Sequence, residues 1–73
     1  MDQDLIAANA IKVPVDEAKL HVKVLDQVKA KYYWDPKRGG LHVIVAENGE
    51  KLAATSALTY EKLLKAFLDG KRN

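Results

Sequence analysis

Residues 41–55, LHVIVAENGEKLAAT, carry the signal that decides the fold of this chain. Two runs rich in apolar residues flank the pair Asn48-Gly49. This pair favours a two-residue type I′ turn, because the twist of that turn matches the twist of paired strands. We therefore predict a β-hairpin whose strands span residues 41–47 and 50–55.

The alternation of side chains along this hairpin predicts two apolar faces. With a two-residue turn, one face carries Leu41, Val43, Val45, Leu52 and Ala54, with Val45 opposite Leu52 and Val43 opposite Ala54. The other face carries His42, Ile44, Ala46, Lys51, Ala53 and Thr55, which is unusually apolar for a face in contact with water. Either residues 1–15 cover it, or Ile44, Ala46 and Ala53 form a secondary candidate surface for a partner. Addition of a partner strand at an exposed edge is a further option.

The segment after the hairpin has the features of a capped helix. Thr59 is a typical N-cap residue, and Leu58 and Leu63 have the spacing of a hydrophobic staple. Gly70 stands where a glycine often ends a helix. The expected buried stripe consists of Tyr60, Leu63, Leu64 and Phe67. We expect residues 71–73 to be a frayed tail.

Residues 17–34 lie before the hairpin and contain no Gly, Pro or Asn. They follow Asp16, a favourable N-cap, and steps of 100° per residue place Ala18, Val22, Leu25, Val28 and Tyr32 on one side. This pattern predicts an amphipathic helix. Residues 18–25 also fit a strand, since Ala18, Leu20, Val22 and Val24 alternate with Lys19, His21 and Lys23. The cap and the uninterrupted length favour the helix.

The N-terminal part has a weaker pattern. Residues 11–15 alternate as an extended segment does, and Pro14, which lacks an amide proton, places that segment at a sheet edge. Residues 1–10 form either a short helical turn or an extended arm. The predicted fold is a small α+β domain, with an edge segment, a helix, a β-hairpin and a helix around a two- or three-stranded antiparallel sheet. We expect an arm at 1–10, one domain at 11–70 and a tail at 71–73.

The composition limits the classes of protein to which the chain can belong. A chain of 73 residues is too short for a Rossmann domain, a barrel or a large catalytic cleft. Its net charge of +2 does not by itself argue for nucleic-acid binding. It lacks cysteine, its acidic start is unlike a secretory signal, and no apolar stretch approaches the roughly 20 residues of a membrane span. We expect a soluble protein of the cytoplasm.

Few residues are suited to catalysis or metal binding. Ser56 is the only serine and lies outside any nucleophile-elbow pattern, and His21 and His42 stand far apart without the spacing of metal ligands. Glu47 and Glu50 flank the hairpin turn, where we expect them to keep the turn soluble. We therefore expect no enzyme activity, no metal and no cofactor.

The aromatic and cationic run at residues 29–38 is the strongest candidate for a binding site. Tyr, Trp and Arg are enriched at binding hot spots, because they contribute a large contact area with few rotatable bonds. Successive side chains point in different directions in a helix and in a strand, so at least one of the three adjacent aromatic residues must lie near the surface. The candidate partner-binding residues are Lys29, Lys31, Tyr32, Tyr33, Trp34, Lys37 and Arg38.

These observations favour a small non-enzymatic regulator or inhibitor that binds a protein. It would dock on a larger machine, such as the transcription apparatus, and act by occlusion, as small accessory proteins of phages and plasmids do. The alternative is a small DNA- or RNA-binding domain whose aromatic residues stack on bases while its cations contact phosphates. A third option is a structural subunit of a homo-oligomer. Nothing indicates a membrane or a small-molecule substrate as partner.

Overall fold

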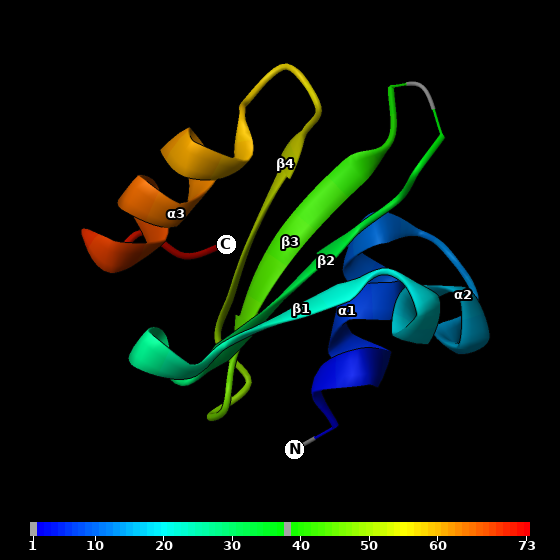
Figure 1. Cartoon of the computed structure of the whole chain (residues 1–73), viewed down its shortest axis with the longest axis horizontal. Coiled ribbons are helices and arrows are strands. Elements are labelled where there is room, and N and C mark those ends of the chain that lie inside the picture. Colours follow the sequence, from blue (N-terminus) through cyan, green and yellow to red (C-terminus); the bar gives the residue numbers. More distant parts are fainter. Residues whose placement is uncertain (1, 38) are drawn as a thin grey trace.

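The computed structural model describes residues 2–37 and 39–73 (Figure 1). Along these residues the elements are α1 (Gln3–Ile11), α2 (Val15–Leu20), β1 (Val22–Leu25), the 3-10 turn η1 (Asp26–Val28), β2 (Ala30–Trp34), β3 (Leu41–Ala46), β4 (Lys51–Thr55) and α3 (Tyr60–Leu68). The strands form one antiparallel sheet in the order β1-β2-β3-β4. The α+β class is confirmed, but the sheet is larger than predicted.

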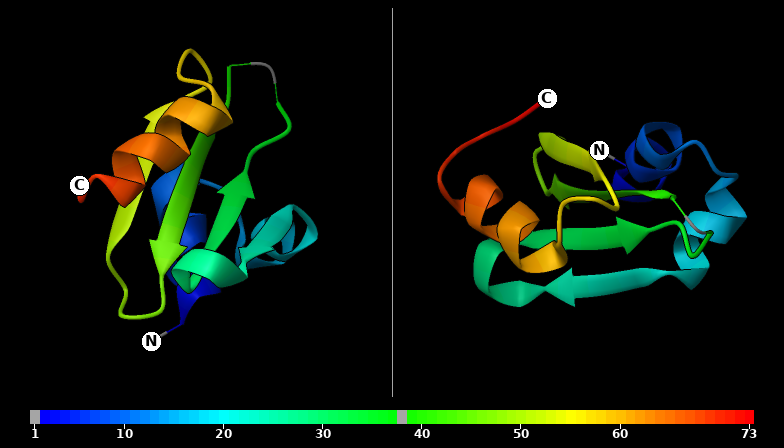
Figure 2. Two further views of the ribbon diagram at one scale, coloured as in Figure 1. Left: turned by 60° about the vertical axis from the view of Figure 1, so that its left-hand side comes forward. Right: turned by 90° about the horizontal axis from the view of Figure 1, so that it is seen from above.

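Helices cover both faces of the sheet (Figure 2). On one face, Ala7, Ala8 and Ile11 of α1 and Ala18 of α2 are buried against Tyr33, Val43 and Val45. On the other face, Leu63 and Phe67 of α3 are buried against Ala30 and Ile44. The sheet is thus the middle of three layers. This arrangement explains why the hairpin has two apolar faces, since neither face of its central strand is left to water.

The hairpin lies where the sequence predicts it, but its register differs by one residue. The Ala46 N–H donates to the Glu50 carbonyl at 2.8 Å, and the Gly49 N–H donates to the Ala46 carbonyl at 3.0 Å. Ala46 and Glu50 are thus the last bonded pair, and residues 47–49 form a three-residue loop. Gly49 has a φ of 92°, whereas Asn48 does not have a positive φ. A type I′ turn needs positive φ at both central residues, so the predicted turn type is wrong. A three-residue loop with glycine in the left-handed region replaces it.

The shift of one residue moves every side chain of β4 to the opposite face. Val43 pairs with Ala53 and Ile44 pairs with Leu52, whereas the predicted partners were Ala54 for Val43 and Leu52 for Val45. Ile44 and Ala53 therefore lie on opposite faces, and Ile44 is fully buried beneath α3. Ile44, Ala46 and Ala53 therefore do not form the single secondary surface that the sequence predicts. Ile44 is covered by α3 and not by residues 1–15.

The predicted helix at residues 17–34 is wrong. Only residues 15–20 are α-helical, as α2, and β1 and β2 follow as a second hairpin joined by the 3-10 helix η1. Lys29 takes the left-handed conformation, with a φ of 52°, where the chain turns without a glycine. The β-branched and aromatic residues of 22–34 suit a sheet that is covered on both faces. The alternative strand prediction for residues 18–25 is correct for residues 22–25.

The N-terminal predictions also need correction. Residues 3–11 form α1, whose N-cap Asp2 accepts a hydrogen bond from the Leu5 N–H at 3.2 Å. Residues 11–15 are not an extended edge strand, because Lys12 ends α1 in the left-handed region and α2 begins at Val15. Pro14, not Asp16, occupies the N-cap position of α2. The α1 helix contributes Ala7, Ala8 and Ile11 to the core.

The caps of α3 are confirmed. The Thr59 hydroxyl accepts a hydrogen bond from the Lys62 N–H at 3.3 Å. At the other end, Gly70 has a φ of 96° and its N–H donates to the Phe67 carbonyl, while the Lys71 N–H donates to the Ala66 carbonyl. These two bonds form a Schellman motif, which satisfies carbonyl groups that the helix leaves free.

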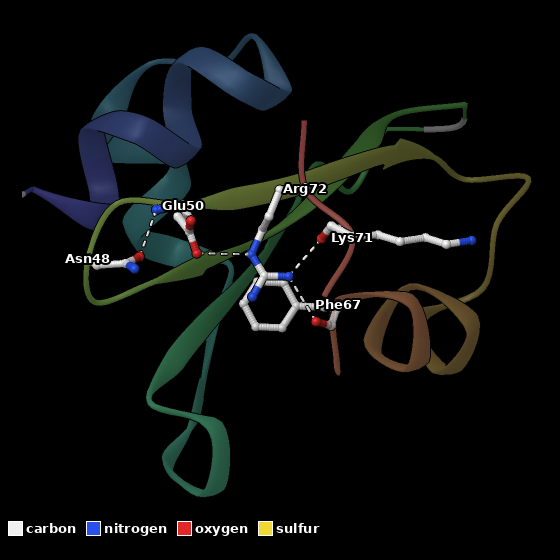
Figure 3. A network of polar contacts seen from close by, with 5 residues as sticks. All are labelled: Asn48, Glu50, Phe67, Lys71 and Arg72. Carbon is white, nitrogen blue, oxygen red and sulfur yellow. Dashed lines mark hydrogen bonds and ion pairs between the residues drawn. The ribbon is translucent and has the colours of Figure 1, made fainter. Parts of the chain in front are cut away.

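The C-terminal residues 71–73 fold back onto the domain. The Arg72 guanidinium lies 3.8 Å from the centre of the Phe67 ring, donates to the Phe67 and Lys71 carbonyls and pairs with Glu50 at 3.5 Å (Figure 3). Asn73 then bonds to the outer edge of β4. Its N–H donates to the Lys51 carbonyl at 2.9 Å, and its side-chain amide bonds to both the N–H and the carbonyl of Ala53. The tail thereby covers the edge of β4.

Candidate functional site

The three adjacent aromatic residues of β2 point to alternate faces of the sheet. Tyr33 faces α1 and is fully buried, and its hydroxyl donates a hydrogen bond to the Asp4 carboxylate. Burial and this carboxylate raise the pKa of Tyr33 above its ordinary value. Tyr32 and Trp34 lie on the face of α3 and are only partly buried. The prediction that at least one of these aromatic residues lies near the surface is confirmed.

A hollow lies between β1, β2 and the first residue of α3. Tyr32 and Trp34 of β2 form one wall of it. Their rings stack with centres 5.5 Å apart, and the Tyr60 ring meets Tyr32 edge-on at 4.5 Å. Lys23 is paired with Tyr32 across the sheet, and its ammonium lies 5.3 Å from the centre of the Tyr60 ring. We call this site of about 310 Å³, lined by Lys23, Tyr32, Trp34 and Tyr60, the aromatic hollow.

Two histidines contact the aromatic residues of the aromatic hollow, His42 at Tyr32 and His21 at Trp34. His42 is buried, with 6% of its surface exposed, and its Nδ1 hydrogen-bonds the Tyr32 hydroxyl at 2.9 Å. The His21 ring lies 5.7 Å from the Trp34 ring. Burial lowers the pKa of His42, although the nearby Thr55 and Leu58 carbonyls partly oppose this shift. A neutral His42 can therefore hold the Tyr32 ring in place.

The burial of His42 predicts a loss of stability in acid. The unfolded chain protonates this histidine near pH 6.5, whereas the folded protein keeps it neutral to a lower pH. The unfolded state binds more protons in that window, so the free energy of unfolding should fall as the pH drops below about 6.5, by at most about 1.4 kcal/mol per pH unit. Urea denaturation between pH 7 and pH 5 measures this loss.

A His42→Gln variant should lose less stability than the unmodified protein over the same pH interval. The control is His21→Gln, because the His21 side chain is 27% exposed and near Glu17. This control should keep the acid loss of the unmodified protein. An acid loss that survives in His42→Gln would show that another group causes it.

The remaining predicted site residues do not join the aromatic hollow. Lys29 and Lys31 line a different, polar hollow together with Gln3 and Glu47. Lys37 is exposed in the loop after β2. Arg38 lies outside the described residues. The aromatic and cationic run is thus divided between several surfaces, because consecutive strand residues face opposite sides.

Two residues of the aromatic hollow were not among the predicted site residues. Lys23 is one of the polar residues in the alternative strand pattern of residues 18–25, and Tyr60 belongs to the predicted buried stripe of the last helix. The signal that identifies Lys23 is the strand alternation of residues 22–25, which becomes informative only when β1 is paired with β2. No sequence signal places Tyr60 beside Tyr32, since packing of α3 on the sheet brings them together.

The aromatic hollow and its surroundings offer contact area for a ligand. Ser56, His42 and Asp35 line an adjoining hollow of about 250 Å³, but no hydrogen bond joins Ser56 to His42 within residues 2–37 and 39–73. His42 Nδ1 is bonded to Tyr32, and among the described residues its buried Nε2 has no hydrogen-bond partner, so neither ring nitrogen is bonded to Ser56. Among the same residues no group of three or more His, Asp or Glu side chains is placed to hold a metal ion.

No model of a known protein family matches the chain, and no curated protein or solved structure is significantly similar to it. In the part of the chain that the structure describes, no helix is both long and apolar enough to cross a membrane.

Proposed function

We propose that this chain is a small non-enzymatic regulator or inhibitor that binds a protein in the cytoplasm. It docks on a larger machine, such as the transcription apparatus, through the aromatic hollow and acts by occlusion. One observation carries the proposal. Tyr32, Trp34 and Tyr60 keep their rings partly exposed around one open hollow, so three of the five aromatic residues of the chain converge on a single accessible surface.

The geometry of the aromatic hollow suits a protein side chain. Tyr32 and Trp34 supply flat apolar area, and their mutual stacking limits the rotamers that binding must restrict. Lys23 adds a cation at the rim, beside the Tyr60 ring. The volume of about 310 Å³ lies at the lower end of the range of about 300–1,000 Å³ for ligand pockets, and the site is open to solvent. It therefore accommodates an anchor residue of a partner.

The position of the hollow explains how it stays accessible. The α3 helix lies chiefly over β3 and β4 (Figure 2). It meets the Tyr32 end of β2 through Tyr60 in its first turn, and Leu63 and Phe67 pack against Ala30 at the other end of β2. A partner can therefore approach the exposed half of this face without displacing a helix. A domain of this size that occupies one contact site on a large machine would exclude other ligands from it by volume alone.

We expect Trp34→Ala to abolish capture of the partner from native cells while the fold is retained. A buried aromatic anchor at an interface typically contributes about 2 kcal/mol or more, which corresponds to a loss of affinity of about 30-fold. The measurement is affinity capture with the tagged full chain, followed by a titration of the captured protein with each variant. Circular dichroism reports whether the variant is folded.

The control is Leu5→Ala, because Leu5 is 47% exposed on α1, on the other side of the sheet. This variant should capture the partner as the unmodified chain does. Equal capture by Trp34→Ala would contradict the proposal. Recovery of DNA or RNA in place of a protein, with binding that weakens steeply as salt rises, would favour the alternative function, in which Tyr32 and Trp34 stack on bases.

A further inference from the structure

The outer edge of β1 carries main-chain groups that no other strand among residues 2–37 and 39–73 pairs. The Trp34 N–H donates to the His21 carbonyl at 3.2 Å, so residues 21 and 34 form a hydrogen-bonded pair. Such pairs alternate along an antiparallel ladder, hence Lys23 and Leu25 bond to β2 while the N–H and carbonyl groups of Val22 and Val24 point outward. No other described residue hydrogen-bonds these outward groups.

The opposite edge of the sheet is closed. Asn73 bonds to the outward groups of Lys51 and Ala53 on β4, and Arg72 holds the tail against Phe67 (Figure 3). An exposed edge is a template for pairing with another chain, so proteins usually block it. This domain blocks β4 with its own tail and leaves β1 open, which singles out β1 as an edge for a partner strand.

The side chains of β1 restrict what such a strand can be. Val24 is 56% exposed, and Val22 and Val24 share the face of α1. Lys23 points to the other face, over the Tyr60 ring. A second copy of β1 paired along its length through Val22 and Val24 would place Lys23 opposite its own copy, and like charges directly opposite each other are unfavourable. A strand with an acidic residue opposite Lys23 would instead form a cross-strand ion pair.

We propose that β1 accepts an extended segment of the partner protein in which one acidic residue stands between two apolar residues. The segment pairs with the outward groups of Val22 and Val24, its carboxylate meets Lys23, and its apolar side chains cover Val24. This inference rests on the proposed function and names the chemistry of the partner. It also places the segment beside the aromatic hollow, because Lys23 belongs to both.

The test uses two blocked octapeptides, one with Val-Glu-Val at its centre and one with Val-Lys-Val, titrated into the isotopically labelled full chain and followed by nuclear magnetic resonance. We expect the Val-Glu-Val peptide to shift the amide signals of Val22 and Val24 and to slow their hydrogen exchange. The Val-Lys-Val peptide should bind at least about threefold more weakly, since it places like charges together.

Two variants distinguish a loss of strand pairing from a loss of the fold. Lys23→Glu should reverse the order of the two peptides, which an unfolded or inert variant cannot do. Val24→Pro removes an outward N–H that the sheet itself does not use, so the domain should stay folded and lose the peptide. The matched control Val24→Thr keeps that N–H and should bind the Val-Glu-Val peptide.

Three results would overturn the inference. The first is the absence of shifts at Val22 and Val24 at millimolar peptide. The second is an equal response to both peptides, and the third is a concentration-dependent dimer through β1 in sedimentation. Shifts at the Trp34 indole alone are an instance of the first result, and they would leave the proposed function standing. Loss of Trp34-dependent capture from cells would instead contradict the proposed function, whatever the peptides do.

Discussion

We expect Phe67→Ala to lower the free energy of unfolding by about 3–5 kcal/mol. Phe67 is 4% exposed and fills the layer between α3 and the sheet, against Ile44 and Leu63. Truncation leaves a cavity and also removes the ring on which the Arg72 guanidinium lies. Equilibrium unfolding in urea, followed by Trp34 fluorescence, measures the loss.

The matched control is the next residue of the same helix. Leu68 is 58% exposed, so Leu68→Ala should change the free energy of unfolding by about 1 kcal/mol or less. Helix propensity is nearly the same in the two variants, since both introduce alanine. Equal losses in Phe67→Ala and Leu68→Ala would mean that α3 does not pack through the face that contains Phe67.

We expect the protein to lose stability steeply above about pH 10 because of Tyr33. Burial and the Asp4 carboxylate raise the pKa of this phenol, whereas in the unfolded chain it ionises near 10.0. Above that pH the unfolded state releases a proton that the folded state retains. The stability present below pH 10 is therefore lost as the pH rises toward the folded pKa, by about 1.4 kcal/mol per pH unit from this residue.

Tyr33→Phe should be less stable than the unmodified protein at neutral pH, by about 1 kcal/mol, because it loses the hydrogen bond to Asp4. Its free energy of unfolding should fall less steeply between pH 10 and pH 11.5. Tyr32, whose pKa is raised by burial and by Tyr60, contributes to the slope that remains. Identical slopes for the two proteins would exclude Tyr33 as the source.

The prediction for residues 17–34 failed because two periodicities fit the same residues. Spacing alone allows a helix with Val22, Leu25 and Val28 on one side, and it allows strands with Val22 and Val24 alternating with lysines. The outcome depended on neighbours that are distant in sequence. β2 lies between β1 and β3, so Tyr33 is buried under α1 while Tyr32 faces α3. An isolated helix could not bury these adjacent side chains on two sides.

The register of the β3–β4 hairpin shows a related limit. Asn48-Gly49 marks the position of the turn, but two-residue and three-residue loops both suit this pair. In a sheet with one face exposed to water, the alternation of polar and apolar residues would distinguish the two registers. Here both faces are covered, so the local pattern does not distinguish Leu52 from Ala53 as the residue beneath α3. The observed register puts the larger Leu52 on the face of α3 and the smaller Ala53 near α1.

The sequence by itself determined the α+β class, the position of the β3–β4 hairpin and the α3 helix with its caps. These features depend on residues a few positions apart, such as Thr59 with Lys62 and Gly70 with Phe67. Only the tertiary structure decided the β1–β2 hairpin, the register, the aromatic hollow and the closure of β4 by Asn73. In each case the deciding contact joins residues far apart in the chain, and its free energy outweighs a local preference that was weak or ambiguous.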